Sequence, residues 1–187
     1  MNCYACLCKQ EYEKDGYVLL PLRQEDIFLI MEWRNQQIDV LRQKEPLGRD
    51  KQQQYYEENI QPTFVMAQPP QILFSLLLEG RCVGYGGLVH IDWEANRGEM
   101  SFLADTARAV QPEVYELDFS HYIRLLQEVA FNDLGFHRIS GETYDIREHH
   151  VAIMEKNGFV REGRLREHVT IGGHYVDSLM HGCLKGD

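Results

Sequence analysis

The sequence lacks the features that mark membrane and secreted proteins. No window approaches the roughly 20 consecutive apolar residues that span a bilayer. The first residues, MNCYACLCKQEYEKDG, contain no basic segment followed by an apolar one, so they do not resemble a secretory signal. We therefore expect a cytosolic protein that has no membrane partner.

Positive charge is also scarce. The chain has 19 Lys and Arg against 29 Asp and Glu, which gives a formal net charge of −10. A protein that tracks nucleic acid needs a basic surface for the phosphates, so no nucleic-acid partner is expected. The balance suits a small or cationic acceptor such as an amine, although it is also ordinary for an acidic soluble protein.

Cysteine is uncommon and odd in number. Three of the five cysteines, Cys3, Cys6 and Cys8, form a C-x-x-C-x-C pattern that has no fourth zinc ligand nearby. Chain ends are often poorly ordered. We expect residues 1–15 to be a flexible, reduced tail without a bound metal, and residues 16–187 to be a single domain.

Repeats, low-complexity tracts and linkers are absent as well, and the remaining pattern is one of short elements. Apolar periodicity predicts helices at 24–35, at 49–60, from Asp118 to the break at Gly135, and at 147–156. Alternating or continuous apolar runs predict strands at 17–22, 71–78, 81–91, 97–104, 137–144, 159–171 and 175–184. Residues 105–117 fit neither pattern.

The C-terminal quarter has the most specific order of elements. A helix ends at Asn157-Gly158, a pair that supplies the left-handed helix stop, and two strands flank the Gly172-Gly173 turn before Tyr175 and Asp177. This order resembles the closing half of the GNAT superfamily of acyl-CoA-dependent N-acyltransferases. Within it, the ribosomal-protein N-acetyltransferase-like and nucleotide-amino-sugar N-acetyltransferase-like branches are most similar. The resemblance covers about residues 16–185 and implies an α/β (α+β) GNAT fold, a mostly antiparallel mixed sheet of about seven strands flanked by about four helices.

The resemblance also implies where acetyl-CoA binds. Its pantetheine is expected beside Phe102, Leu103 and Ala104, and its pyrophosphate on the loop that leads into the next helix. Relatives carry a Gly-x-Gly or Gly-x-Ala turn there, but the two glycine positions fall on Leu117 and Phe119 in this chain.

Two interpretations of that departure stay open. The longer loop forms the phosphate cradle by another route, with backbone amides near Asp118 and a positive charge from Arg108. Alternatively, the fold is kept while CoA binds weakly or not at all. Arg147 stands where relatives begin the next motif, and it is expected to meet phosphate or pantetheine carbonyls.

Three residues are candidates for proton transfer. Glu99 matches the acidic position at the start of the fourth strand of relatives, and it is expected to accept the amine proton, directly or through water. His150 is expected near the thioester sulfur, where it would protonate the CoA thiolate, and Tyr144 is a second candidate acid. A solvent-facing glutamate, a surface histidine and a buried strand tyrosine are the structural alternatives.

The acceptor side is suggested by Trp33-Arg34-Asn35, which is similar to a tripeptide in many relatives, including the amino-sugar acetyltransferases. Trp33, Arg34 and Tyr55 are therefore expected to line the acceptor cleft, while core packing by Trp33 and capping of the helix end by Asn35 remain alternatives. Two helices over 23–71 would roof that cleft, which favours a small or nucleotide-linked amine over a long peptide.

Together these features predict an N-acetyltransferase in which an amine attacks acetyl-CoA directly in a ternary complex. No Cys–His or Ser–His arrangement at recognisable spacing suggests a covalent enzyme intermediate. The alternative is a GNAT-fold module that senses acyl-CoA or a partner without efficient catalysis. The sequence is compatible with a monomer or a homodimer.

Overall fold

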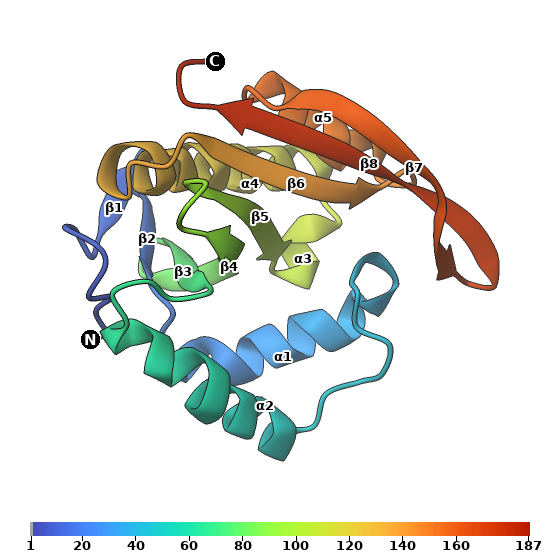
Figure 1. Ribbon diagram of the computed structural model, residues 1–187. Coiled ribbons are helices and arrows are strands. Elements are labelled where there is room, and N and C mark those ends of the chain that lie inside the picture. The colour runs from blue at the N-terminus through green and yellow to red at the C-terminus, as the bar shows by residue number, and fades with distance from the viewer. Residues whose placement is uncertain (1) are drawn as a thin grey trace.

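The fold is built around one eight-stranded sheet whose strands lie almost in chain order (Figure 1). The computed structural model describes residues 2–187. The strand order is β1-β2-β3-β4-β5-β6-β8-β7. The strands are β1 (Tyr12–Lys14), β2 (Tyr17–Pro21), β3 (Ile72–Leu78), β4 (Arg81–Asp92), β5 (Arg97–Ala104), β6 (Arg138–Tyr144), β7 (Val160–Ile171) and β8 (His174–Leu184).

All neighbouring strands are antiparallel except β5 and β6, which are parallel. The β5–β6 pairing comprises only Arg97 with Arg138, Gly98 with Ile139, and Glu99 with Ser140. Beyond these residues β5 continues along β4 and β6 continues along β8, but not along each other. The sheet therefore divides at this point, and the backbone edges on either side of the division are free to pair with a ligand.

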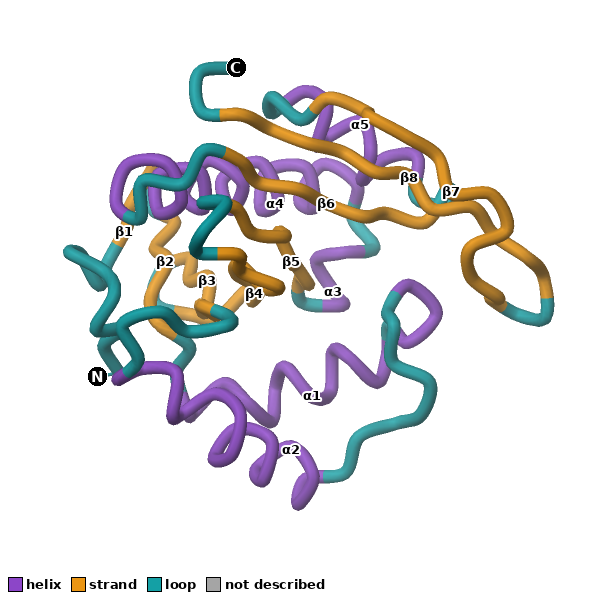
Figure 2. The backbone as a smooth tube through the Cα atoms, viewed as in Figure 1, coloured by secondary structure: helices purple, strands orange, loops and turns teal. Residues whose placement is uncertain are grey.

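Helices cover both faces of the sheet. α1 (Ile27–Gln36) and α2 (Arg49–Tyr55) lie along one side, and α4 (Pro112–Gln127) and α5 (Glu148–Lys156) lie along the other (Figures 1 and 2). The short α3 (Thr106–Ala109) follows β5. The remaining helical turns are η1 (Gln24–Asp26), η2 (Ile38–Val40), η3 (Tyr56–Ile60), η4 (Gln61–Val65) and η5 (Glu128–Asp133).

The core reflects the patterns that predicted these elements. β3 is buried along nearly all of its length, which explains its continuous apolar run. The stripe of α4 that faces the sheet is fully buried, with Phe119, Tyr122, Ile123 and Leu126 each 0% exposed. The predicted α/β architecture is confirmed, with eight strands in place of about seven and five α-helices in place of about four.

The segment between β5 and the long helix is helical, which corrects the prediction of an irregular loop over residues 105–117. Asp105 caps α3 by accepting a hydrogen bond from the Ala107 amide at 2.8 Å, and Pro112 begins α4. Proline at the first helical position is a usual start signal. The predicted helix start at Asp118 is therefore about six residues too late, and Asp118 is not its N-cap.

The N-terminal residues are packed against the domain, which corrects the expected flexible tail. Tyr4 is 1% exposed and Tyr12 is 2% exposed. The Tyr4 hydroxyl accepts a hydrogen bond from the Leu73 amide at 2.8 Å and donates to the Leu73 carbonyl at 3.1 Å. Tyr12 opens β1, which pairs with β2 and supplies the eighth strand. Large aromatic side chains near a terminus were the signal that the prediction overlooked.

Two further findings concern the described part of the chain. Within residues 2–187, no helix is long and apolar enough to cross a membrane. In the same range no three His, Cys, Asp or Glu side chains lie close enough together to hold a metal ion.

Candidate active site

The division between β5 and β6 opens into a cavity of about 250 Å³. One wall is the end of β5 that no longer pairs with β6, and the facing wall is the end of β6 together with the first turns of α5. The residues that line it from these elements are Glu99, Met100, Ser101, Phe102, Gly141, Glu142, Thr143, Tyr144, Arg147, His150 and Met154. Below, the name "strand opening" means this cavity.

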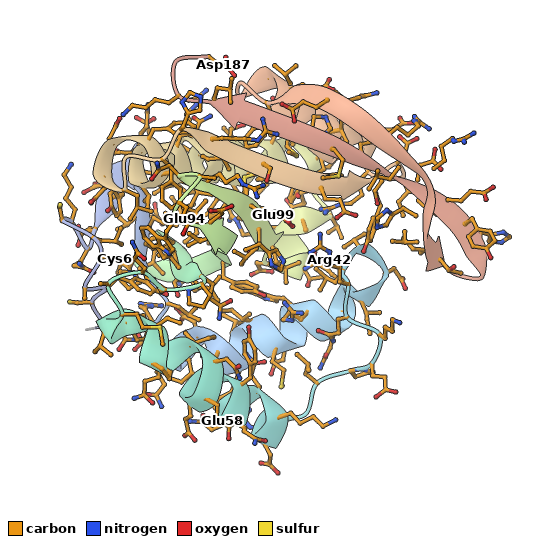
Figure 3. All side chains as sticks on the ribbon, in the orientation of Figure 1. Cys6, Arg42, Glu58, Glu94, Glu99 and Asp187 are labelled. Carbon is orange, nitrogen blue, oxygen red and sulfur yellow. The ribbon has the colours of Figure 1, made fainter. Side chains whose placement is uncertain are left out.

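Two carboxylates face the strand opening from its two walls, Glu99 on β5 and Glu142 on β6. Arg42, from the segment after α1, donates through Nη2 to Glu99 Oε1 at 3.1 Å and to Glu142 Oε2 at 2.6 Å. Figure 3 labels Arg42 and Glu99 in this region. One guanidinium therefore joins the two walls by hydrogen bonds to both carboxylates.

Glu142 is held in its charged form. Burial opposes its ionisation, but the Ser178 hydroxyl and the Arg42 guanidinium outweigh that effect and keep the pKa of Glu142 below its usual value. Its side chain is 12% exposed, whereas that of Glu99 is 23% exposed. Glu99 is thus the more accessible of the two carboxylates and the better placed to exchange a proton with a ligand.

A hydrogen-bonded chain borders the opening on the α5 side. Arg147 Nη2 donates to the Tyr115 hydroxyl at 3.0 Å, and that hydroxyl lies 2.7 Å from His150 Nδ1. Because the Tyr115 oxygen accepts from Arg147, its proton is directed to Nδ1, which leaves the proton of a neutral imidazole on Nε2. Burial lowers the pKa of His150 well below its usual value, so this ring is neutral at pH 7.

The His150 ring is fixed by packing as well as by hydrogen bonding. It stacks on Phe119 with 4.2 Å between ring centroids. No protein group among residues 2–187 bonds to His150 Nε2. The alternative of a plain surface histidine applies to the neighbouring His149, which is exposed, and not to His150, which is buried.

Tyr144 is the last residue of β6 and is 8% exposed. Burial raises the pKa of its hydroxyl, so the phenol stays protonated at neutral pH and is able to donate. It lines the strand opening and also a neighbouring cavity of about 580 Å³ beside the β7–β8 hairpin. The structure thus brings Glu99, His150 and Tyr144 to the walls of one opening.

A second cavity, of about 480 Å³, lies between the sheet and the helices α1 and α2. We refer to it as the helix cavity. It shares five lining residues with the strand opening: Arg34, Leu41, Val89, Ser101 and Phe102. Tyr55 and Arg34, two of the residues predicted to contact the acceptor, both line it. Trp33 does not line it: this side chain is 4% exposed and belongs to the hydrophobic core, the alternative considered for it.

Asn35 has a different role from the predicted helix cap. Its side-chain amide donates to the Leu47 carbonyl at 2.9 Å and accepts from the Leu47 amide at 2.8 Å. It therefore holds the segment between α1 and α2 closed over the helix cavity. That segment carries Arg42.

A third cavity, of about 440 Å³, lies where the end of α1 approaches α3 and the start of α5. It shares Val40, Arg147 and His150 with the strand opening. Arg147 has no carboxylate partner among residues 2–187, so its charge is available to an anionic ligand. The three cavities follow one another in the order third cavity, strand opening, helix cavity.

The predicted phosphate cradle is not where the sequence placed it. Arg108 Nε and Nη2 donate to Asp118 at 2.6 and 2.7 Å, and Asp118 also accepts from the Tyr17 hydroxyl at 2.7 Å. Asp118 is 0% exposed. This ion pair, in which the carboxylate is buried and Arg108 is partly exposed, ties α3 to α4 and engages both groups. Leu117 and Phe119 lie inside α4, where backbone amides are already bonded, so the premise of free amides there is wrong.

The end of β5 is closely packed around the remaining predicted cofactor contacts. Phe102 stacks on Phe119 and Tyr122, with centroids 4.9 and 4.4 Å apart, and still lines both the strand opening and the helix cavity. Leu103 faces the helix cavity. The Ala104 carbonyl accepts from the Gln37 side chain at 2.9 Å, so it is already satisfied within the protein.

Sequence reasoning missed Arg42, Tyr115 and Glu142. Arg42 reaches residues 57 and 100 positions away in the chain, a contact that no local pattern signals. Tyr115 lies in the segment that fitted no pattern. Glu142 was detectable in principle, because it stands two residues before Tyr144 on one strand and therefore shares its face.

This chain is similar to proteins of known family and structure. A family model described as an acetyltransferase (GNAT) domain matches residues 19–180. The solved structure of spermidine N-acetyltransferase from Vibrio cholerae in complex with CoA and spermine is similar, with a TM-score of 0.77 and 19% identity over 91% of this chain and 96% of that chain. Mutant forms of the spermidine/spermine N-acetyltransferase from the same organism give a TM-score of 0.75 and 21% identity over 91% and 95%. At such identities these solved structures show the fold. No curated protein matches the sequence.

Proposed function

This chain belongs to the GNAT acetyltransferase family, and we infer that its acetyl-CoA-dependent N-acetyltransferase activity is located in the strand opening. The observation that carries the proposal is the β5–β6 pairing, which ends after three residue pairs. Beyond it, two free backbone edges face each other across a cavity. The amide groups of an extended pantetheine arm are a suitable partner for such edges.

Acetyl-CoA is proposed to extend along the three successive cavities, which share lining residues with one another. We place the phosphates in the third cavity, near Arg147 and the start of α5, instead of near Arg108 and Asp118. The pantetheine then extends along the strand opening beside Met100 and Phe102, and the acetyl group reaches the residues shared with the helix cavity. Arg147 suits this role because a guanidinium binds phosphate oxygens in pairs, and within residues 2–187 it forms no ion pair, although Asp39 and Glu148 also line this cavity.

Acetyl-CoA supplies a thioester whose C–S bond breaks as the acceptor nitrogen forms a bond to the acetyl carbon. Glu99 accepts the proton that leaves this nitrogen, directly or through water. No cysteine among residues 2–187 lines the strand opening or the helix cavity, which supports direct attack without an acyl-enzyme.

Two neutral groups are placed to return a proton to the departing sulfur. The His150 Nε2–H is held by the hydrogen bond at Nδ1, and Tyr144 lines the same opening. Either donation leaves a balanced reaction, with the thiol of CoA and the N-acetylated amine as products. Tyr144→Phe and His150→Gln, compared under the same conditions, identify which group donates, because removal of the donor lowers kcat more than removal of the other group.

The acceptor is proposed to be a compact amine in the helix cavity. Its volume of about 480 Å³ is typical of small-molecule sites, and α1, α2 and the segment fixed by Asn35 cover one side of it. Such a covered cavity suits a small or nucleotide-linked amine better than a long peptide.

The proposal is tested in two steps on the full chain. Acetyl-CoA at 100 times its dissociation constant should stabilise the fold by about 2.7 kcal/mol in a thermal-shift measurement. CoA release is then followed with amino sugars, polyamines, small amino acids and N-terminal peptides. Stabilisation without turnover on any amine would favour a binding module over an enzyme, and turnover only with peptides would contradict the compact acceptor.

A further inference from the structure

The helix cavity has an unusual charge for a protein of this composition. Its charged lining residues are Arg34 and Lys51, and no Asp or Glu is among the described residues that line it. The whole chain, by contrast, has 29 acidic and 19 basic residues. The lining that remains is apolar or neutral, with Gln52, Gln71 and the hydroxyls of tyrosines. The cavity is therefore positive inside an acidic protein.

Arg34 is the main source of this charge. Its side chain is half-buried at the junction between the helix cavity and the strand opening. Nε donates to Gln43 Oε1 at 3.0 Å, and Nη1 donates to the Tyr85 hydroxyl. Both partners are neutral, and Nη2 bonds to no protein group among residues 2–187. The guanidinium thus lacks the carboxylate that Arg42 and Arg108 each have.

A guanidinium in this position favours an anion. It stays charged at every pH that proteins tolerate, and its removal from water costs free energy unless an opposite charge compensates it. Its planar fork binds carboxylate or phosphate oxygens in pairs. A polyamine chain in the same cavity would bring further positive charges against Arg34 and Lys51, with no carboxylate in the lining to offset them.

We propose that the acceptor is a primary amine whose body carries an anionic oxyacid group, a carboxylate or a phosphate, bound by Arg34 in the helix cavity. This inference rests on the proposed function. The apolar lining takes the body of the acceptor, Lys51 at the exposed mouth adds a second, weaker attraction, and the amine nitrogen points through the Ser101–Phe102 junction towards Glu99. The acceptor class thereby differs from the spermine held by the Vibrio cholerae structure.

A structural role for Arg34 is the competing explanation. Its bonds to Gln43 and Tyr85 join α1 to the covering segment and to β4. That role would change the stability of the fold and affect all acceptors alike. Anion recognition changes the ratio between an anionic and a neutral acceptor of the same shape, so the ratio separates the two explanations.

The experiment uses three amines that share one scaffold: 4-(aminomethyl)benzoate, benzylamine and p-xylylenediamine, which are anionic, neutral and cationic at the far end. Glucosamine 6-phosphate and glucosamine form a second pair that tests phosphate in place of carboxylate. We expect kcat/KM to be roughly 10- to 100-fold higher for the anionic member than for the neutral one, the range of a charged hydrogen bond, and lowest for the diamine. The better of the two anionic compounds identifies the oxyacid.

Variants identify the side chain that distinguishes anionic from neutral acceptors. Arg34→Gln should reduce the anionic-to-neutral ratio to near one, Arg34→Lys should restore part of it, and Lys51→Gln should lower it a few-fold. Lys14→Gln, which removes the same charge from an exposed position of β1 that lines none of the three cavities, should leave the ratio unchanged. Thermal shifts by the same compounds give a reading that does not require turnover.

The outcomes separate this inference from the proposed function. Equal or better turnover of benzylamine or the diamine would overturn the inference while the acetyltransferase function stands. Preferential stabilisation by the anionic compounds that is lost in Arg34→Gln, without CoA release from any amine, would support the anion site and contradict catalysis. If no amine is turned over and no anionic compound stabilises the fold preferentially, both the inference and the proposed function are overturned.

Discussion

The strand opening and the helix cavity meet at Ser101 and Phe102, yet they are built from different parts of the chain. The walls of the strand opening include two strand edges that no longer pair with each other. Both of its carboxylates, Glu99 and Glu142, bond to one guanidinium, that of Arg42. The helix cavity is enclosed by side chains, and its central charge, Arg34, has only neutral partners.

This difference explains why the family identifies the acyl donor but not the acceptor. A site for a common donor can be made by strand pairing, which the fold determines and many sequences share. A site for a particular acceptor depends on individual side chains, which vary within one fold. The family therefore identifies acetyl-CoA, whereas the acceptor must be inferred from the residues of this chain.

The largest effect on this comparison is expected from removing the proposed base, Glu99, from the strand opening. Glu99→Gln keeps the size of the side chain but cannot accept the amine proton. We expect kcat to fall by about 10²- to 10⁴-fold with little change in acetyl-CoA affinity, because a base acts on the acceptor and not on the donor contacts. Steady-state kinetics and acetyl-CoA titration measure both quantities.

Glu94→Gln is the matched control, since Glu94 lies exposed on the turn before β5, away from the opening (Figure 3). Unchanged turnover in Glu99→Gln together with its loss in His150→Ala would show that the assigned roles are wrong.

A second substitution tests a residue that stabilises the structure around the proposed acetyl-CoA site without lining it. Asp118 lies behind the strand opening and holds Arg108 and Tyr17 without lining any of the three cavities. Asp118→Ala leaves the Arg108 guanidinium without its buried partner and should lower the free energy of unfolding by about 3–5 kcal/mol. Urea unfolding measures this loss.

Glu113→Ala, on the exposed first turn of the same helix, serves as the comparison and should change stability by less than about 0.5 kcal/mol. A small effect of Asp118→Ala would mean that Arg108 is free to serve a phosphate after all.

The junction between the two cavities depends on a glycine. A Cβ added to Gly86 on β4 would lie 2.0 Å from the Ser101 carbonyl oxygen and 2.6 Å from the Tyr122 hydroxyl. We expect Gly86→Ala to cost about 1–3 kcal/mol of stability and to shift Ser101, which lines both cavities. Gly163→Ala is the control, because nothing lies within 4 Å of the added carbon there. Equal stability of the two variants would refute the close approach of β4 to β5.

A smaller effect concerns the pH dependence of stability. Because burial lowers the pKa of His150 well below its usual value, the folded state does not take up the proton that the unfolded chain binds below about pH 6.5. The unfolded state then binds more protons, so stability falls as the pH falls, by about 1.4 kcal/mol per pH unit from this group.

Urea unfolding at pH 7.5 and 5.5 tests the sign. His150→Gln should lose less stability between the two pH values than the parent protein, whereas His149→Gln, at the exposed neighbour, should lose as much. A parent-like pH dependence in His150→Gln would mean that this imidazole protonates in the folded protein.

Much of the fold was predictable from local patterns. The predicted strand over residues 97–104 coincides with β5, and Asn157-Gly158 ends α5 as expected. Residues 105–117 were not predictable in this way, because the Arg108–Asp118 pair and the fit of Tyr115 against His150 depend on contacts between elements. The buried N-terminal residues were missed because a prior about chain ends outweighed Tyr4 and Tyr12.

Several residues of the candidate site were predictable from the sequence, but the ion pairs and unpaired charges around them were not. Glu99, Tyr144 and His150 were found from family positions and do line one opening. Their partners were not found, because Arg42 and Glu142 meet across 100 residues of chain, and the absence of a carboxylate near Arg34 is visible only in three dimensions.

The most direct test of the account is to map both ligands on one protein by backbone amide chemical shifts. CoA should perturb amides of residues 100–104 and 147–150 along the strand opening, and 4-(aminomethyl)benzoate added afterwards should perturb residues around Arg34 and Tyr55 in the helix cavity. Perturbations by CoA confined to the helix cavity, or to residues 117–119 of α4, would contradict the assignment of donor and acceptor to these two regions.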